Sequence, residues 1–186
     1  MELKSWKAWV VAAVALLLAF YSLGLLYEGF VSDHYSGVFT FPLVDKISAE
    51  RAYGRLPATT PTAERAAAAQ RLIEADPTNP ESWTAVAYAD WLAHGRLSAK
   101  GVEALDHSYA VSFFDRPGAV WRVDFALENW ADMTPHIRQD ALEEARVALK
   151  DPDLGPVMAT HLKAIRSPEG RLAGLLLLSM NSKPVS

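Results

Sequence analysis

The longest feature of the hydropathy pattern is a run of twenty residues, 8–27, that contains no charged side chain. As an α-helix at about 1.5 Å per residue it would span roughly 30 Å, the thickness of the hydrocarbon core of a bilayer. Lys4 and Lys7 precede the run and no Lys or Arg follows until Lys46, a bias that keeps the amino end in the cytoplasm. The pattern predicts a single-pass inner-membrane protein with residues 1–7 cytoplasmic and the carboxyl-terminal domain in the periplasm.

A cleaved signal peptide is the alternative interpretation of this run, and Ser22-Leu23-Gly24 offers a small-x-small cleavage site. The apolar core of a signal peptide is about 7–15 residues long, shorter than the run found here. The length therefore favours an uncleaved transmembrane helix that contacts the lipid bilayer through residues 8–27.

Small side chains recur inside the run at spacings of four, three, four and three residues, which places them on one stripe of a helix. Such a stripe lets two transmembrane helices approach closely. We predict that it packs against an integral membrane partner, although alanine is also simply common in this chain. The residues are Ala8, Ala12, Ala15, Ala19 and Ser22.

The segment 28–61 mixes aromatic residues with Gly, Ser and Pro and has no sustained helical period. An extended piece at 38–41 and a short helix at 48–53 are expected within it, followed by a Pro-rich linker at 55–61. The pattern leaves open whether the aromatic side chains of this neck rest on the bilayer or pack against the rest of the protein.

From residue 62 the pattern becomes helix after helix, with start and stop signals between them. Thr62, Asn79, Ser98 and Thr134 are candidate amino-terminal caps, and Gly95 is a candidate terminator. The pattern predicts an all-α domain. Its helices are expected at 63–75, 80–94, 99–115, 118–132, 135–151, 156–165 and 168–181, of which the last two, in the segment 153–186, would cap the domain.

The helices of the segment 62–152 come in pairs with a period. Trp83 and Trp121 open successive first helices 38 residues apart, and Ser98 and Thr134 begin successive second helices 36 residues apart. A period in this range is typical of a helix–turn–helix solenoid, in which each unit buries its apolar face against its neighbours.

One unit resembles a tetratricopeptide repeat (TPR). It has an Asp-Pro-x-Asn-Pro junction, then Trp83, a small residue at Ala87, an aromatic at Trp91 and Gly95 between the helices. The unit is longer than the family's 34 residues, and Gly101 falls where the second helix should be continuous. The resemblance implies a protein-binding scaffold but transfers no peptide-binding residues.

Composition narrows the classes of function. The 18 Lys and Arg residues are outnumbered by 22 Asp and Glu residues, for a net charge of −4, which argues against nucleic-acid binding. The sequence contains no cysteine, which excludes disulfides, thiolate catalysis and cysteine-ligated zinc.

No residue pattern predicts catalysis, a cofactor or a metal site. The five histidines, His34, His94, His107, His136 and His161, have no metal-ligand spacing. Glu128, Asp132 and His136 would share a helix face, but Thr134-Pro135 interrupts the helix. The adjacent Glu143 and Glu144 are expected on a solvated face, paired with Arg146 or Lys150.

Three carboxylates lie beside the Trp-rich faces of the two helices that open successive pairs, 80–94 and 118–132. They are the candidate partner-binding residues of the helical domain. In a solenoid these faces would line a groove that recognises a basic segment of a partner. Alternatively, the tryptophans are core and the carboxylates point outward. The three residues are Asp90, Asp124 and Glu128.

Two functions follow from these patterns. The first is a non-catalytic, membrane-anchored scaffold subunit whose partners are integral membrane or envelope proteins. The second is an enzyme or accessory factor acting on envelope glycans or polysaccharides, with an acidic groove. Shifted pKa values at Asp90, Asp124 and Glu128 would favour the enzyme, and conspicuous exposed apolar surface would favour the subunit.

Overall fold

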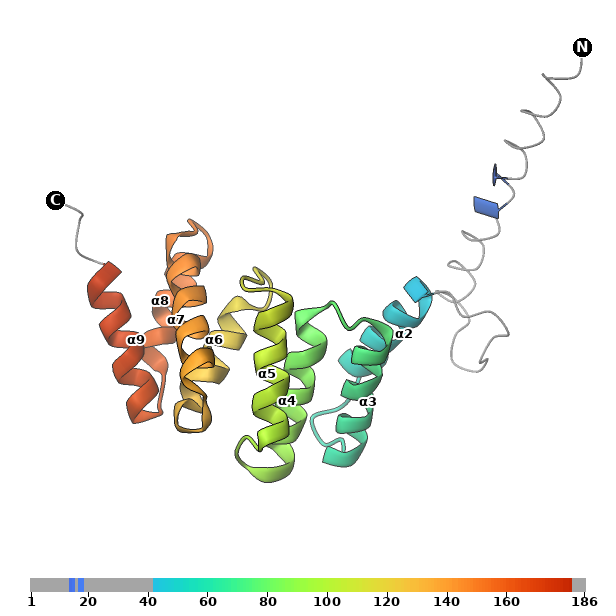
Figure 1. Ribbon diagram of the computed structural model, residues 1–186, viewed down its shortest axis with the longest axis horizontal. Coiled ribbons are helices and arrows are strands. Elements are labelled where there is room, and N and C mark those ends of the chain that lie inside the picture. Colours follow the sequence, from blue (N-terminus) through green and yellow to red (C-terminus); the bar gives the residue numbers. More distant parts are fainter. Residues whose placement is uncertain (1–13, 16, 19–41, 182–186) are drawn as a thin grey trace, which may run out of the picture. The chain divides into compact units, whose positions relative to one another are not determined.

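The protein is all-helical in the part that the computed structural model describes, residues 14, 15, 17, 18 and 42–181 (Figure 1). No strand occurs among these residues, so the predicted all-α class is confirmed for them. The chain divides into two compact units, 1–51 and 52–186, and each is described by itself.

In the first unit, residues 14, 15, 17 and 18 are helical and exposed, and helix α2 (Pro42–Gly54) begins. This helix is longer than the predicted 48–53, because Pro42, which lacks an N–H group, suits a first helical turn. The rest of the predicted span 8–27 and the extended piece at 38–41 lie outside the described residues. Within the described residues, no helix is long and apolar enough to cross a membrane.

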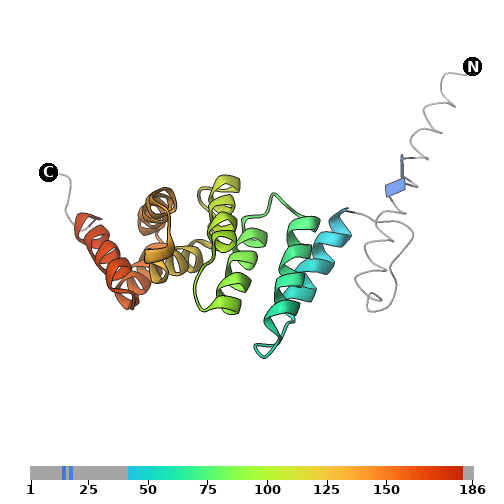
Figure 2. The same cartoon turned by 60° about the horizontal axis from the view of Figure 1, so that its bottom comes forward.

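In the second unit, helices that follow one another in the chain pack together, except that α5 packs on α7 and not closely on α6 (Figures 1 and 2). Helix α4 packs between α3 and α5, and α6 packs on α7, α8 and α9. The elements are α3 (Thr62–Ala75), α4 (Pro80–His94), α5 (Ala99–Val111), α6 (Ala119–Glu128), a 3₁₀ turn η1 (Trp130–Asp132), α7 (Pro135–Lys150), α8 (Leu154–Ala164) and α9 (Pro168–Asn181).

Three of the predicted helix signals act as expected. The Asn79 side chain accepts a hydrogen bond from the Glu81 N–H at 3.0 Å, and the Thr134 hydroxyl accepts one from the Ile137 N–H at 3.2 Å. Gly95 ends α4 with φ of 69°, a left-handed conformation that glycine adopts without steric penalty.

Three other expectations were wrong in detail. Thr62 is the first residue of α3 and Pro61 holds the cap position, without a side-chain cap bond. Ser98 begins α5, but its hydroxyl donates to Asp90 Oδ1 at 2.8 Å instead of capping. The predicted helix 118–132 splits into α6 and η1 at Asn129, whose side-chain amide donates to the Phe125 carbonyl at 2.8 Å and competes with the helix for that acceptor.

The cores of the second unit are built from alanine and aliphatic side chains. Three side chains are fully buried between α3, α4 and α5: Ala69, Ala87 and Leu105. The two alanines are small and let neighbouring helices approach closely. A larger cluster joins α6 to α9 and consists of Val123, Leu127, Ala145, Ala148, Met158, Leu162, Ile165 and Leu177. Helix α9 nevertheless leaves Leu172, Leu175, Leu176 and Met180 exposed.

Helix α5 continues through Gly101, the residue that departs from the repeat family's pattern. A methyl group at this position would overlap the Asp90 carboxylate and the Leu97 side chain. Asp90 in turn accepts hydrogen bonds from the backbone N–H and the hydroxyl of Ser98, both at 2.8 Å. The glycine therefore makes room for a carboxylate that joins α4 to the start of α5.

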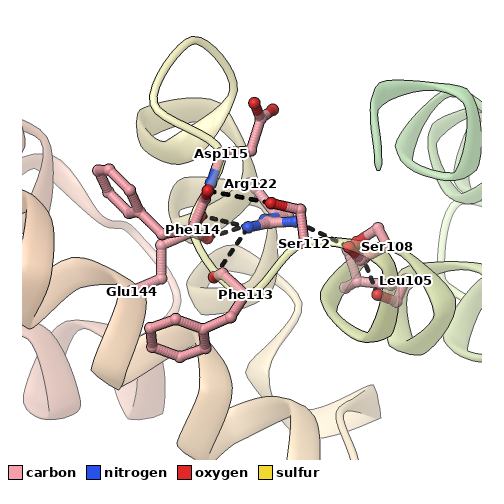
Figure 3. Close-up of polar contacts among 8 residues, drawn as sticks. All are labelled: Leu105, Ser108, Ser112, Phe113, Phe114, Asp115, Arg122 and Glu144. Carbon is pink, nitrogen blue, oxygen red and sulfur yellow. Dashed lines mark hydrogen bonds and ion pairs between the residues drawn. The ribbon is translucent and has the colours of Figure 1, made fainter. Parts of the chain in front are cut away.

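A fully buried ion pair connects α6 to α7 (Figure 3). Arg122 donates to both carboxylate oxygens of Glu144, from Nε at 2.8 Å and from Nη2. The same guanidinium donates to the Ser108 and Phe113 carbonyls, both at 3.1 Å, and lies 4.2 Å from the centre of the Tyr109 ring. The expectation that Glu144 is solvated was wrong, because the charge that satisfies it comes from another helix.

The turn between α7 and α8 is organised by Asp151. Its Oδ1 accepts the N–H groups of Asp153 and Leu154, both at 2.9 Å, at the start of α8. Arg116, in the segment between α5 and α6, donates to Asp151 Oδ2 at 3.1 Å and joins that segment to this turn. These hydrogen bonds, with the one from Arg116 contributing most, lower the pKa of Asp151 to about 2.

Candidate functional site

A pocket of about 390 Å³ lies where α4, α6 and α8 meet the turn before α9. Aromatic side chains come from α4 and α6, and ionisable side chains come from α6, α8 and the turn. The lining residues are Tyr88, Trp91, Trp121, Asp124, Phe125, Glu128, Asn129, His161, Ala164, Ile165 and Arg166.

Helix α6 supplies the pocket with one complete face. Trp121, Asp124, Phe125 and Glu128 follow the spacing i, i+3, i+4 and i+7 and therefore lie on one side of the helix. Ala119, Arg122, Val123, Ala126 and Leu127 are buried. The sequence of α6 thus divides into a core face and a face that is both aromatic and acidic.

The four rings form a continuous aromatic cluster. Trp121 and Phe125 stack with centroids 4.8 Å apart and planes inclined by 13°. The Tyr88 ring stacks on Trp91 at 6.1 Å and meets Trp121 edge-on at 5.9 Å. Trp91 and Phe125 also meet edge-on at 6.4 Å. These geometries are the favoured ones for aromatic pairs, yet Trp121 keeps 41% of its surface exposed.

Asp124 forms the polar centre of the pocket together with His161. Asp124 Oδ2 lies 2.5 Å from His161 Nδ1, and because an ionised carboxylate only accepts, Nδ1 carries the proton. Burial raises the pKa of Asp124, nearby Glu128 raises it further, and the hydrogen bond from His161 opposes the shift. The second oxygen, Oδ1, is buried without a hydrogen-bond donor among the described residues.

Glu128 holds the turn that closes the pocket. Its two carboxylate oxygens accept the backbone N–H groups of Arg166 and Ser167, each at 3.0 Å. The Arg166 side chain is 90% exposed, and its Nε lies 3.5 Å from Glu128 Oε1. One carboxylate therefore both positions the start of α9 and contributes negative charge to the pocket.

The structure brings two of the three predicted partner-binding carboxylates together. Asp124 and Glu128 line the pocket, whereas Asp90 is outside its lining and is engaged with Ser98. Of the small residues predicted to meet a membrane partner, Ala15 is helical and exposed. Ala8, Ala12, Ala19 and Ser22 lie outside the described residues.

The other clusters considered from the sequence do not form a site. Asp132 accepts a hydrogen bond from the Leu97 N–H at 3.3 Å, and His136 pairs with Asp140 on its own helix at 2.9 Å, so neither joins Glu128. In the described part of the chain, no group of three or more His, Asp or Glu side chains is placed to hold a metal ion.

Sequence reasoning missed His161, Tyr88 and Arg166 as pocket residues. His161 is 37 residues from Asp124, and no short-range pattern joins the two. Tyr88 could have been found from the sequence, because it lies on α4 three residues before Trp91 and therefore shares a helix face with it.

The fold and pocket define a class: an all-helical protein with an aromatic and acidic pocket between packed helices. In comparisons with known proteins, no protein-family model, no curated protein and no solved structure matches this chain.

Proposed function

We propose that this protein is a non-catalytic, membrane-anchored interaction subunit whose helical domain binds a segment of an envelope protein in the α4–α6–α8 pocket. The observation that carries the proposal is the aromatic and acidic face of α6. Tryptophan and tyrosine side chains are enriched among the residues that dominate protein–protein affinity, and here they line a concave surface.

The sequence pattern supports the same proposal. The period of 36–38 residues and the resemblance to a TPR imply a scaffold made of helical pairs, and the packing of α4 on α5 and of α6 on α7 is compatible with it. The run 8–27 would hold this scaffold at the inner membrane with the pocket in the periplasm. Tethering raises the effective concentration of a partner, so that modest contacts suffice.

An enzyme acting on envelope glycans is the second candidate, and the His161–Asp124 pair favours it. A carboxylate that orients a histidine is a common arrangement for general-base catalysis, and the raised pKa of Asp124 fits such a site. A glycan hydrolase normally uses a pair of carboxylates. The second carboxylate of the described lining is Glu128, whose two oxygens already accept the backbone N–H groups of Arg166 and Ser167 and hold the turn before α9. Binding therefore accounts for more of the pocket.

The experiment compares tagged full-length proteins purified from their native membrane in mild detergent. Trp121→Ala removes an exposed ring from the pocket, and Phe113→Ala removes a similarly exposed ring outside it, 43% against 41% exposed. We expect wild type and Phe113→Ala to retain the same partner at near-equal amount. Trp121→Ala should retain at least about tenfold less, since anchor tryptophans contribute roughly 2 kcal/mol or more.

Equal recovery of the partner with both variants would contradict docking in the pocket. Circular dichroism of each purified variant must show unchanged helicity, so that loss of the partner is not loss of the fold.

A further inference from the structure

We infer that the pocket binds the guanidinium group of an arginine side chain in the docking segment of the partner. The inference rests on the proposed function and specifies the chemistry that the pocket recognises. It follows from three features of the pocket: its aromatic surface, the two carboxylates on one face of α6, and the planar shape of the group that suits both.

The aromatic cluster attracts cations. The faces of indole and phenol rings carry negative electrostatic potential, and a cation within about 6 Å of a ring centroid is attracted to it, more strongly when the cation is desolvated. Four rings surround this pocket, and Trp121 is still 41% exposed. The protein therefore offers exposed ring surface in the same pocket as two acidic groups.

The charged side chains of the pocket also favour a cation, because the negative ones outnumber the positive one. Asp124 and Glu128 stand one helical turn apart on the same face of α6, where like charges repel. Arg166 is the one Lys or Arg of the described lining, and its Nε lies 3.5 Å from Glu128 Oε1. Because its side chain is 90% exposed, solvent screens this pair. A positive group between Asp124 and Glu128 would relieve their repulsion.

The hydrogen-bonding capacity of Asp124 also points to a donor. Its Oδ2 is engaged with His161, whereas its buried Oδ1 has no donor among the described residues. Buried carboxylate oxygens normally accept hydrogen bonds. Asp124 therefore keeps capacity for a further hydrogen bond from a donor.

Arginine suits this arrangement better than lysine does. A guanidinium is planar, stacks on aromatic faces and donates in a fork that matches carboxylates, whereas a lysine ammonium is a compact and strongly hydrated charge. A ring surface next to two carboxylates matches the planar group.

The test uses a short capped Gly/Ser peptide with one central arginine, and matched peptides with lysine or with citrulline, the neutral isostere of arginine. Each is titrated into the full chain in detergent while the indole N–H signals of Trp121 and Trp91 are followed by NMR. The arginine peptide should shift both signals and bind at least about fivefold more tightly than the citrulline peptide, in line with the contribution of a cation on aromatic rings.

Variants test whether each of the two carboxylates contributes to binding of the arginine peptide. Asp124→Asn and Glu128→Gln should each weaken the arginine peptide by about fivefold or more, while Glu103→Gln on the exposed face of α5 should not change its affinity. Affinity should also fall as the pH is lowered, because burial raises the pKa of Asp124 and protonation of its carboxylate removes the charge. The other titratable lining groups are Glu128, His161, Arg166 and, from α4, Tyr88.

Equal affinities for the arginine and citrulline peptides, or no shift at about 10 mM arginine peptide, would overturn the inference. In that case a loss of the partner from Trp121→Ala would still support docking through a different ligand. If instead the arginine peptide binds and Trp121→Ala keeps its partner, the pocket recognises the cation but the proposed docking function is wrong.

Discussion

Replacing Glu144 with leucine is expected to lower the free energy of unfolding by about 3–5 kcal/mol, a large share of the stability of a typical domain. The Arg122 side chain is 1% exposed and its partner is fully buried. An arginine keeps its charge in proteins at all pH values, so the substitution leaves an unpaired cation in the core. The measurement is urea unfolding of the full chain, followed by far-ultraviolet circular dichroism.

Arg122→Met should be milder, because the remaining carboxyl can become neutral. Burial raises the pKa of Glu144, and Arg122 opposes this shift in the wild type. Without the arginine the pKa rises further, so the loss of stability should shrink as the pH falls. The double variant Arg122→Met/Glu144→Leu should be more stable than Glu144→Leu alone. Arg116→Met, which removes one member of an exposed ion pair, should change stability little. A small effect of Glu144→Leu would show that the pair does not hold α6 against α7.

Gly170→Ala is expected to destabilise the protein by about 1–3 kcal/mol, although alanine normally favours a helix over glycine. A methyl group at this position in α9 would overlap the backbone carbonyl oxygen of Leu127, in the last turn of α6. Backbone atoms cannot move aside as a flexible side chain can, so α9 must shift. The measurement is the midpoint of thermal unfolding relative to the wild type.

Gly54→Ala is the matched control for Gly170→Ala. A methyl group at Gly54 meets nothing within 4 Å, and the residue is helical. The stability of the Gly54→Ala protein should therefore equal or slightly exceed that of the wild type. Because Gly170 is near the turn that Glu128 holds, we also expect Gly170→Ala to weaken arginine-peptide binding. Equal stability of the two alanine variants would contradict the close approach of α9 to α6.

The sequence allowed the helices of the second unit to be predicted because their boundaries are set locally. Asn79 before Pro80 and Thr134 before Pro135 place the cap within three residues of the N–H group that it accepts. Thr62 shows the limit of such signals: a residue that often caps lies instead inside the first turn of α3.

The pocket was only partly predictable, because long-range contacts decide it. Asp124 and Glu128 could be found from the face that they share with Trp121 on one helix. His161 could not, since it reaches Asp124 from α8. Asp90 looked equivalent to Asp124 in the sequence but is used to join α4 to α5. Glu144 was misplaced for the same reason, because its partner Arg122 is 22 residues earlier in the chain.

The most direct test of the proposed interaction subunit is photo-crosslinking in the intact native membrane. A photoreactive phenylalanine derivative replaces Ala164, an exposed residue of the pocket lining, in one full-length protein and Phe113 in another, so that Trp121 stays in place. We predict that position 164 yields a single dominant adduct with an envelope protein, and that excess arginine peptide suppresses it. Position 113 should not yield that adduct. The same adducts from both positions, or none from position 164, would contradict a partner bound in the α4–α6–α8 pocket.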